Sequence, residues 1–254
     1  MKTALTIAGS DPTGGAGLQA DLRTFIAMGV YGISVPTALT AQNTDGVHSV
    51  HEVSPDFFSI ELQILLNDIQ PDALKTGMIF DTENVGIIAD TFAQFGLKNL
   101  VVDPVTVSST GVPLVQEGVL DTLKNHLIPL ARVITPNVYE ASVLTGMKVE
   151  NEADMKHVAE KLHGIGPEAV VITGGHLKDR AIDILFDGDD FISLESQMLE
   201  GTYHGTGCVF SSVITAGLAL GYGVKESFVK AKEFVWKGMN SAISIGRGMK
   251  VLGF

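Results

Sequence analysis

Short, continuous apolar runs recur along the chain, and most of them are followed by a glycine, a proline or an aspartate. They cover residues 4–8, 33–39, 73–76, 100–102, 132–135 and 169–173. Runs of this kind are typical of parallel strands buried on both faces. Segments with helical spacing of apolar residues separate them, at residues 18–28, 55–67, 83–95, 116–126 and 152–163. The alternation predicts an α/β fold with a mostly parallel sheet.

Helix starts and turns complete this outline. Ser54 precedes Pro55, and Asn151 precedes an acidic turn, so both are predicted to cap helices. Residues 181–186 and 190–194 are predicted as antiparallel strands joined by the turn 187–189, and residues 207–221 and 224–245 as helices. The sequence contains no linker or repeat, which favours a single domain over residues 1–254.

The predicted strands end in residues with unusual chemistry. In open α/β sheets a ligand lies beyond the carboxyl ends of the strands, so these residues are expected to meet at one rim. They are Gly9-Ser10-Asp11, Gln42-Asn43-Thr44, Gly77-Met78, Asp103-Pro104, Pro136-Asn137 and Gly174-Gly175-His176.

The loop Gly205-Thr206-Gly207-Cys208 opens a long apolar segment. Glycines permit close backbone approach, and the N-terminus of a helix attracts anions, so the loop is a candidate phosphate site. In a first helical turn the pKa of the Cys208 thiol is expected to be lowered. Two structural interpretations remain open here, namely a tight turn capped by Thr206 and a cysteine that only fills the core.

Charge and cysteine content limit the classes of ligand and cellular location that are expected. The 254 residues carry a formal net charge of −12 without a basic cluster, which argues against a nucleic-acid surface. A nucleotide would then need local devices such as a metal ion or backbone N–H groups. The one cysteine excludes an internal disulfide and fits a reducing cytoplasm. A strand-like run begins directly after Met1-Lys2, and residues 201–224 are interrupted by Gly, Ser and Thr, so neither a signal sequence nor a membrane span is expected.

Two common nucleotide-binding motifs, the P-loop and the glycine-rich dinucleotide pattern, do not describe this chain. No Gly-x-x-x-x-Gly-Lys-Ser/Thr sequence is present, so a P-loop is excluded. Residues 15–20 fit the Gly-x-Gly-x-x-Ala dinucleotide pattern, but the glycines come five residues beyond Gly9 instead of at the strand end. We therefore reject a nicotinamide or flavin enzyme.

Taken together, the motifs resemble the hydroxymethylpyrimidine and hydroxymethylpyrimidine-phosphate kinases of thiamine biosynthesis, in the ribokinase superfamily. The resemblance covers nearly the whole chain. It implies a three-layer ribokinase-like fold, with a mostly parallel central sheet flanked by helices on both faces. It also implies that the enzyme uses ATP and Mg²⁺. It also implies a cytoplasmic homodimer. The motifs are residues 4–12 and 14–17, 41–44, 75–78, 103–105, 135–137, 174–176 and 204–208.

The resemblance implies a role for each matching residue. Cys208 stands where many sugar-kinase relatives carry a catalytic aspartate, and Gly205, Thr206 and Gly207 would stabilise the transferring phosphoryl group. Gln42 would bind the aminopyrimidine, because one amide supplies both a donor and an acceptor. The remaining implied residues are Gly9, Ala16, Asp21 and Met78 for the substrate, Asn137, Thr173 and His204 for ATP, and Asp103 and Glu140 for Mg²⁺.

Structural alternatives exist for several of these residues. Gln42 could be an ordinary loop amide and Met78 ordinary core filling. Asn137 and Glu140 have the spacing of a helix capping box, which needs no metal. Thr173 stands where many relatives have a lysine, so this position does not supply the positive charge that the resemblance would place near the phosphates. The first hypothesis is a kinase that phosphorylates the pyrimidine alcohol and then its monophosphate; a pyridoxal kinase and a non-catalytic pyrimidine-binding regulator are the alternatives.

Overall fold

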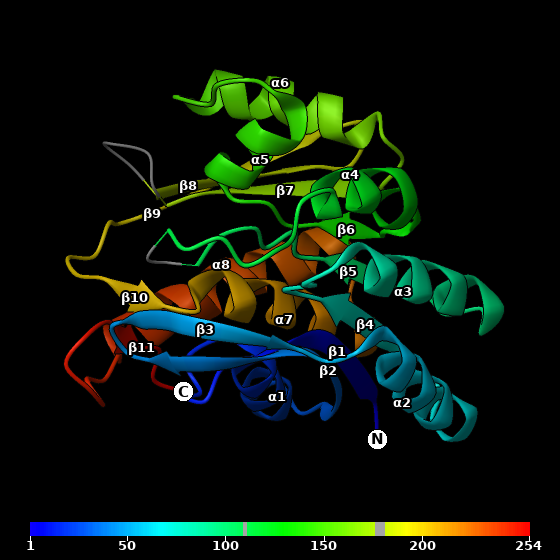
Figure 1. The fold of residues 1–254 in the computed structure, drawn as a ribbon. Coiled ribbons are helices and arrows are strands. Elements are labelled where there is room, and N and C mark those ends of the chain that lie inside the picture. The colour runs from blue at the N-terminus through cyan, green and yellow to red at the C-terminus, as the bar shows by residue number, and fades with distance from the viewer. Residues whose placement is uncertain (109–110, 176–180) are drawn as a thin grey trace.

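A nine-stranded sheet forms the centre of the protein (Figure 1), as seen in a computed structural model that describes residues 1–108, 111–175 and 181–254. The strand order is β3-β2-β1-β4-β5-β6-β7-β8-β9. Strands β2, β1, β4, β5, β6 and β7 run parallel, whereas β3, β8 and β9 are antiparallel to their neighbours. The nine strands are Thr3–Ser10, Tyr31–Asn43, Gly46–Glu52, Ala73–Thr76, Leu100–Val102, Val133–Ile134, Ala169–Gly174, Ala181–Phe186 and Phe191–Ser196.

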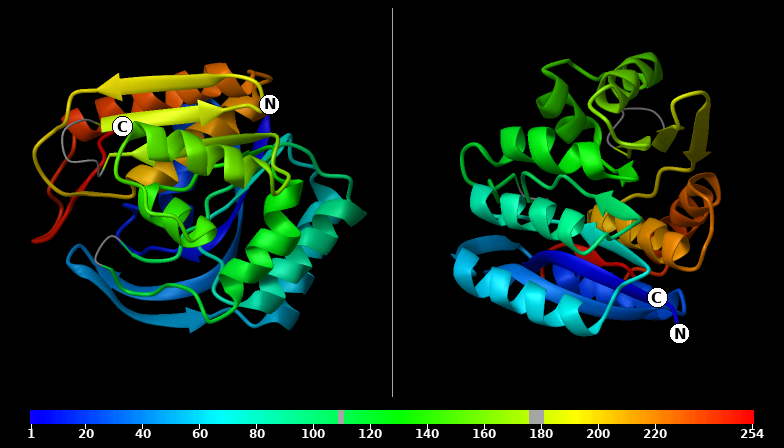
Figure 2. Two further views of the ribbon diagram at one scale, coloured as in Figure 1. Left: turned by 90° about the horizontal axis from the view of Figure 1, so that it is seen from above. Right: turned by 90° about the vertical axis from the view of Figure 1, so that its right-hand side faces the viewer.

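Helices cover both faces of this sheet, which confirms the predicted three-layer architecture. One face packs against α2, α3, α4, α5 and α6, and the other against α1, α7 and α8. The right-hand view of Figure 2 shows the cyan and green helices on one side and the orange helices on the other. The helices are α1 Gly17–Ala27, α2 Pro55–Asp68, α3 Thr82–Gln94, α4 Val119–Thr122, α5 Val138–Thr145, α6 Glu152–His163, α7 Thr206–Ala219 and α8 Val224–Asn240.

The central strands are apolar on both faces because both faces are covered. All four residues of β4 are buried, as are all residues of β5 and β6. This explains why the continuous apolar runs located the parallel strands. Among the described residues, no helix is long and apolar enough to cross a membrane.

Three elements differ from the prediction. Strand β3 was not predicted; it lies at the edge of the sheet and has no buried residue, so its sequence lacks an apolar pattern. The helix predicted at residues 116–126 is a short α4 followed by a π-helical turn, Leu123–Leu127, and a 3₁₀ turn, Ile128–Leu130. The last helix ends at Asn240, because the chain then turns back and Ile243 bonds Val251. Here β11, Lys250–Val251, pairs with β10, Tyr203–His204.

The predicted helix starts are correct in position but differ in their chemistry. Asn151 accepts a hydrogen bond from the Asp154 N–H at 3.0 Å, as expected of a cap. Ser54 occupies the cap position of α2, yet its hydroxyl makes no capping hydrogen bond. Pro55 at the first helical position has no N–H to satisfy, and its fixed φ suits the helix start.

Candidate active site

The strand order brings the predicted site residues to one edge of the sheet and fixes their spatial order along it. Adjacent strands β2, β1, β4, β5, β6 and β7 all present their carboxyl ends on the same edge. The predicted convergence is therefore confirmed. From one end of the rim to the other, the residues at or after these strand ends are Gln42, Gly9, Met78, Asp103, Asn137 and Thr173. His176 of the Gly-Gly-His motif lies outside the described residues.

The glycine loop meets the middle of this rim. Gly205 has φ 80° and is the N-cap of α7, and a Cβ on it would lie 1.8 Å from the Gly15 carbonyl oxygen. Only glycine fits such a contact. The alternative that Thr206 caps the helix is wrong, because Thr206 is the first helical residue and no side chain caps this end. The first turn of α7 therefore keeps its N–H groups for an anion.

Cys208 lies in that first turn, partly buried, and its sulfur accepts a hydrogen bond from the Gly17 N–H. Burial raises the pKa of the thiol to about 12, and the carboxylates of Asp21 and Asp103 act in the same direction. Lys75 opposes this rise without cancelling it. The predicted lowering of the Cys208 pKa is therefore wrong. Enclosure by protein and two nearby negative charges outweigh the helix N-terminus, so Cys208 is a thiol at neutral pH.

Lys75 was absent from the predicted site residues, yet it lies directly beneath the loop. It projects from β4 and is fully buried, with Nζ 2.8 Å from Asp21 Oδ1 and 3.4 Å from the Cys208 carbonyl oxygen. Burial alone would lower its pKa, but the negative charges of Asp21 and Asp103 outweigh burial and raise it, so the ammonium stays charged. A lysine inside the fully buried strand Ala73–Thr76 was the sequence signal for this role.

Asp21 holds this lysine and does not reach the rim. Its side chain is fully buried, and Oδ1 accepts bonds from Lys75 and from Ser212 Oγ at 2.7 Å. Oδ2 accepts a bond from Thr6 Oγ1 at 2.6 Å. Since both oxygens are enclosed by protein donors, direct contact of Asp21 with a substrate does not agree with the structure.

Asp103 and Glu140 form a pair of buried carboxylates on the other side of Cys208. Asp103 accepts a hydrogen bond from Ser211 Oγ at 2.9 Å and lies 4.0 Å from Lys75 Nζ. Burial raises the pKa of Asp103, and burial together with the charge of Asp103 raises that of Glu140 well above its usual value. Two carboxylates that disfavour each other's charge fit a site for a cation, which would relieve the repulsion.

The capping box at the start of α5 is also confirmed. Asn137 Oδ1 accepts the Glu140 N–H, and Glu140 Oε2 accepts the Asn137 N–H, each at 2.9 Å. One Glu140 oxygen is thus engaged in the cap, which limits how many ligands Glu140 can give a metal. Within the described part of the chain, no group of three or more His, Cys, Asp or Glu residues is placed to hold a metal ion. Any Mg²⁺ here would also need oxygens from the nucleotide or water.

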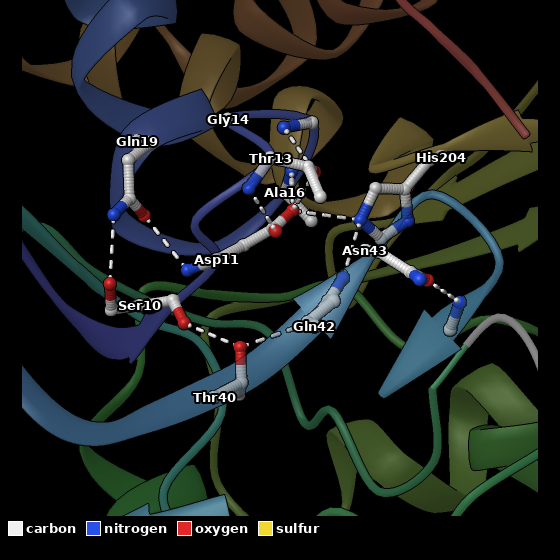
Figure 3. A network of polar contacts seen from close by, with 12 residues as sticks. Ser10, Asp11, Thr13, Gly14, Ala16, Gln19, Thr40, Gln42, Asn43 and His204 are labelled. Atoms are coloured by element: carbon white, nitrogen blue, oxygen red, sulfur yellow. Dashed lines mark hydrogen bonds and ion pairs between the residues drawn. The ribbon is translucent and has the colours of Figure 1, made fainter. Parts of the chain in front are cut away.

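The residues predicted to bind the nucleotide are divided between the two ends of the rim. Asn137 and Thr173 lie together, joined by a parallel β-bridge. His204 lies instead beside Gln42, with its Nε2 2.8 Å from Asp11 Oδ2 and 3.0 Å from the Gln42 amide (Figure 3). His204 is therefore not grouped with Asn137 and Thr173, because the pairing of β10 with β11 holds it at the Gln42 end.

The predicted substrate residues Gly9, Met78, Ala16 and Gln42 surround the same end. A Cβ on Gly9 would lie 2.9 Å from Met78 Sδ, so the thioether packs directly on the glycine. Met78 is also part of a small apolar cluster with Ala38 and Leu114, so the core-filling interpretation holds at the same time. The Ala16 N–H donates to Asp11 Oδ2 at 2.8 Å, which ties the glycine loop after β1 to His204.

Comparison with known proteins agrees with this arrangement. The family model for phosphomethylpyrimidine kinase matches residues 11–252. The hydroxymethylpyrimidine/phosphomethylpyrimidine kinase of Rhizobium meliloti is 44% identical over 250 residues, covering 96% of this chain and 94% of the relative. The thiamine biosynthesis bifunctional protein of Geobacter sulfurreducens is 44% identical over 246 residues, 96% of this chain, but the chain spans only 50% of that longer protein.

A solved structure shows the same fold at high similarity. The ADP complex of Bacillus subtilis pyridoxal kinase superposes with a TM-score of 0.91 and 39% identity, covering 99% of this chain and 96% of that one. The fold is therefore ribokinase-like, as the motifs implied. The extent of the family match and the identity to its members lead to one conclusion: the chain belongs to the phosphomethylpyrimidine kinase family.

Proposed function

We propose that this chain, as a single domain over residues 1–254, transfers the terminal phosphoryl group of ATP to 4-amino-5-hydroxymethyl-2-methylpyrimidine. It then phosphorylates the resulting monophosphate to the diphosphate. The observation that carries the proposal is the order of residues along the rim. The Gln42 amide lies at one end, the Gly205 loop in the middle, and Asp103 with Asn137 towards the other. The Rhizobium meliloti relative bears the name of this activity.

The geometry suggests how the chain's own residues act. The Gln42 end holds the ring, so that the hydroxymethyl oxygen lies near Cys208 and the first turn of α7. The free N–H groups of that turn and the buried charge of Lys75 stabilise negative charge on the phosphoryl group as it moves. Because phosphoryl transfer depends mainly on positioning and charge stabilisation, a thiol with a pKa of about 12 is adequate at Cys208. It can position the substrate hydroxyl without first losing its proton.

Asp103 and Glu140 are the residues that would hold Mg²⁺, directly or through water, between this centre and the nucleotide end. The ion would supply charge neutralisation at the phosphates, which a chain of net charge −12 does not provide by its overall field. Asn137 and Thr173, joined by their β-bridge, would contact the nucleotide.

The proposal is tested by measuring ADP formation from ATP with three acceptors: the pyrimidine alcohol, its monophosphate and pyridoxal. We expect turnover with both pyrimidines and a preference for them over pyridoxal. The Cys208→Ala variant should lose most turnover while it still binds the pyrimidine, measured by calorimetry. Unchanged turnover in that variant would remove Cys208 from the reaction, and no ADP with either pyrimidine would refute the proposed function.

Pyridoxal phosphorylation is the second candidate, favoured by the likeness to the Bacillus subtilis pyridoxal kinase. Both rings are small heteroaromatics with a hydroxymethyl arm, so the phosphoryl-transfer centre serves either. The Gln42 amide favours the pyrimidine, since it matches a ring nitrogen beside an amine. The homodimer and the cytoplasmic location implied by the resemblance stay predictions, to be tested by sedimentation and cell fractionation.

A further inference from the structure

The Gln42 amide is held by protein at both ends, and these contacts determine which way round it lies. As drawn in Figure 3, the amide nitrogen lies 3.0 Å from His204 Nε2 and the carbonyl oxygen lies 3.2 Å from Thr40 Oγ1. The carbonyl and amino ends of a glutamine amide have nearly the same shape. The protons available on the neighbouring groups therefore decide which end faces which neighbour.

Asp11 determines the proton at the His204 end. Its carboxylate accepts bonds from the Thr13 N–H, the Thr13 hydroxyl and the Ala16 N–H at 2.9, 2.9 and 2.8 Å. Burial would raise the pKa of Asp11, but the bonds from His204 and Thr13 outweigh it and hold the pKa below its usual value. A carboxylate only accepts, so His204 Nε2, 2.8 Å away, must carry a proton. The Gln42 atom that faces this N–H must then be the carbonyl oxygen.

Thr40 leads to the same orientation independently. Its hydroxyl lies 2.8 Å from the Ser10 carbonyl oxygen, which can only accept, so the single hydroxyl proton is used there. The Gln42 atom 3.2 Å from Thr40 Oγ1 must therefore be a donor, so we assign the amino group to this position in place of the carbonyl oxygen drawn there. In the opposite orientation, the amino group would face the N–H of His204, and the carbonyl oxygen would face a lone pair of Thr40 Oγ1.

We propose that Asp11 and His204 are positioning residues that fix the Gln42 carbonyl towards His204 and its amino group towards Thr40, and so select the ring that the site accepts. One N–H and one oxygen lone pair of Gln42 remain for a ligand. This pattern fits a ring with an amine beside an acceptor nitrogen. It opposes the 4-oxo counterpart, in which a carbonyl stands beside a ring N–H. The identity of the ring rests on the proposed function, whereas the orientation of the amide does not.

The selection is tested by calorimetry with the 4-amino pyrimidine alcohol and its 4-oxo counterpart. The wild-type chain should prefer the amino ring by on the order of tenfold to a hundredfold, the range of one bidentate pair. In Asp11→Ala the acceptor that fixes the Nε2 proton is gone and only Thr40 still orients the amide, so the preference should fall. His204→Gln should keep the preference, because its amide still donates to Asp11. Asp45→Ala, the same charge change at an exposed residue of the adjacent turn, should leave it unchanged.

A second measurement needs no ligand. Nitrogen-15 NMR of the imidazole rings reports which ring nitrogen carries the proton, and His204→Gln identifies the His204 signals among the seven histidines. We expect the proton on Nε2. A bare Nε2 would overturn the inference, and so would an Asp11→Ala variant that keeps the wild-type preference or weakens the binding of both rings equally. If the wild-type chain binds neither pyrimidine, the proposed function fails, and the NMR result still decides the orientation.

Discussion

Replacing Lys75 by methionine is the sharpest perturbation that the site offers. The change keeps the length of the side chain and removes its charge. Lys75 and Asp21 are both fully buried and lie 2.8 Å apart, so Lys75→Met leaves a carboxylate inside the protein without its cation. Removing one partner of a buried ion pair costs about 3–5 kcal/mol. Typical domains are stable by about 5–15 kcal/mol, so the variant should unfold at much lower urea concentration than the wild type.

The activity of the variant carries a separate expectation. For a separation of about 8 Å between a unit charge and the phosphoryl group, and an effective dielectric constant of about 20, Coulomb's law gives about 2 kcal/mol. That energy corresponds to a loss of roughly thirtyfold in kcat. The Michaelis constant for the pyrimidine should change little, because in the proposed function Gln42 and Met78, and not Lys75, would contact the ring.

A double variant separates the two effects. Lys75→Met with Asp21→Asn removes both charges, and the new amide can still bond Thr6 and Ser212. It should recover most of the lost stability in urea unfolding but not the lost kcat. The control is Lys148→Met, which breaks an exposed pair with Glu150 at 2.7 Å and should leave the unfolding midpoint in urea almost unchanged, because water screens an exposed pair.

Two results would refute this reasoning. If Lys75→Met is as stable as Lys148→Met, the buried pair does not support the fold as argued. If the double variant turns over at the wild-type rate, the charge of Lys75 has no part in phosphoryl transfer.

Three further changes test the loop and the carboxylates. Because the pKa of Cys208 is about 12, alkylation of this sole cysteine by iodoacetamide should rise about tenfold per pH unit from pH 7 to 10 without a plateau; a plateau near pH 8 would contradict the burial argument. Gly205→Ala forces a Cβ to 1.8 Å from the Gly15 carbonyl at φ 80°, and should cost at least about 2 kcal/mol in thermal unfolding. Gly207→Ala, with no atom within 4 Å of the added Cβ, is its control and should cost nothing. Glu140→Gln keeps a side chain that can accept the Asn137 N–H, and it removes a carboxyl group whose pKa is raised in the folded protein. The folded wild type binds that proton more tightly than the unfolded chain, so its stability falls as pH rises from about 4.5 through the folded-state pKa. The variant should show a smaller loss between pH 5 and 8 in urea unfolding, and an unchanged slope would refute the shift.

The sequence predicted those parts of the fold in which one local pattern has one structural solution. Continuous apolar runs located the buried strands β4 and β5 to the residue. The strand ends then located the rim, because parallel strands share one edge. Strand β3 was missed because an exposed edge strand needs no apolar pattern. Its pairing with β2 also depends on contacts that cannot be predicted from the sequence of β3 itself.

The site shows the same division between local and long-range effects. The capping box of Asn137 and Glu140 lies within one helical turn, so its spacing was sufficient to predict it. The pKa of Cys208 was predicted in the wrong direction because two of its main causes, Asp21 and Asp103, are distant in sequence. The contacts of His204 could not be predicted for the same reason, since its partners Asp11 and Gln42 lie at the ends of other strands.

The high pKa of Cys208 changes what the centre requires of its neighbours. A general base would have to be ionised before the reaction, and at neutral pH this thiol is not. Groups whose charge or dipole is already in place then become more important for stabilising the phosphoryl group, and the described residues include the first turn of α7 and the ammonium of Lys75. They are connected, because Lys75 donates to the Cys208 carbonyl oxygen and so fixes that turn over the sheet. A substitution that frees the turn without removing the charge should therefore lower kcat as well, which makes the position of α7, and not the acidity of Cys208, the property on which turnover depends.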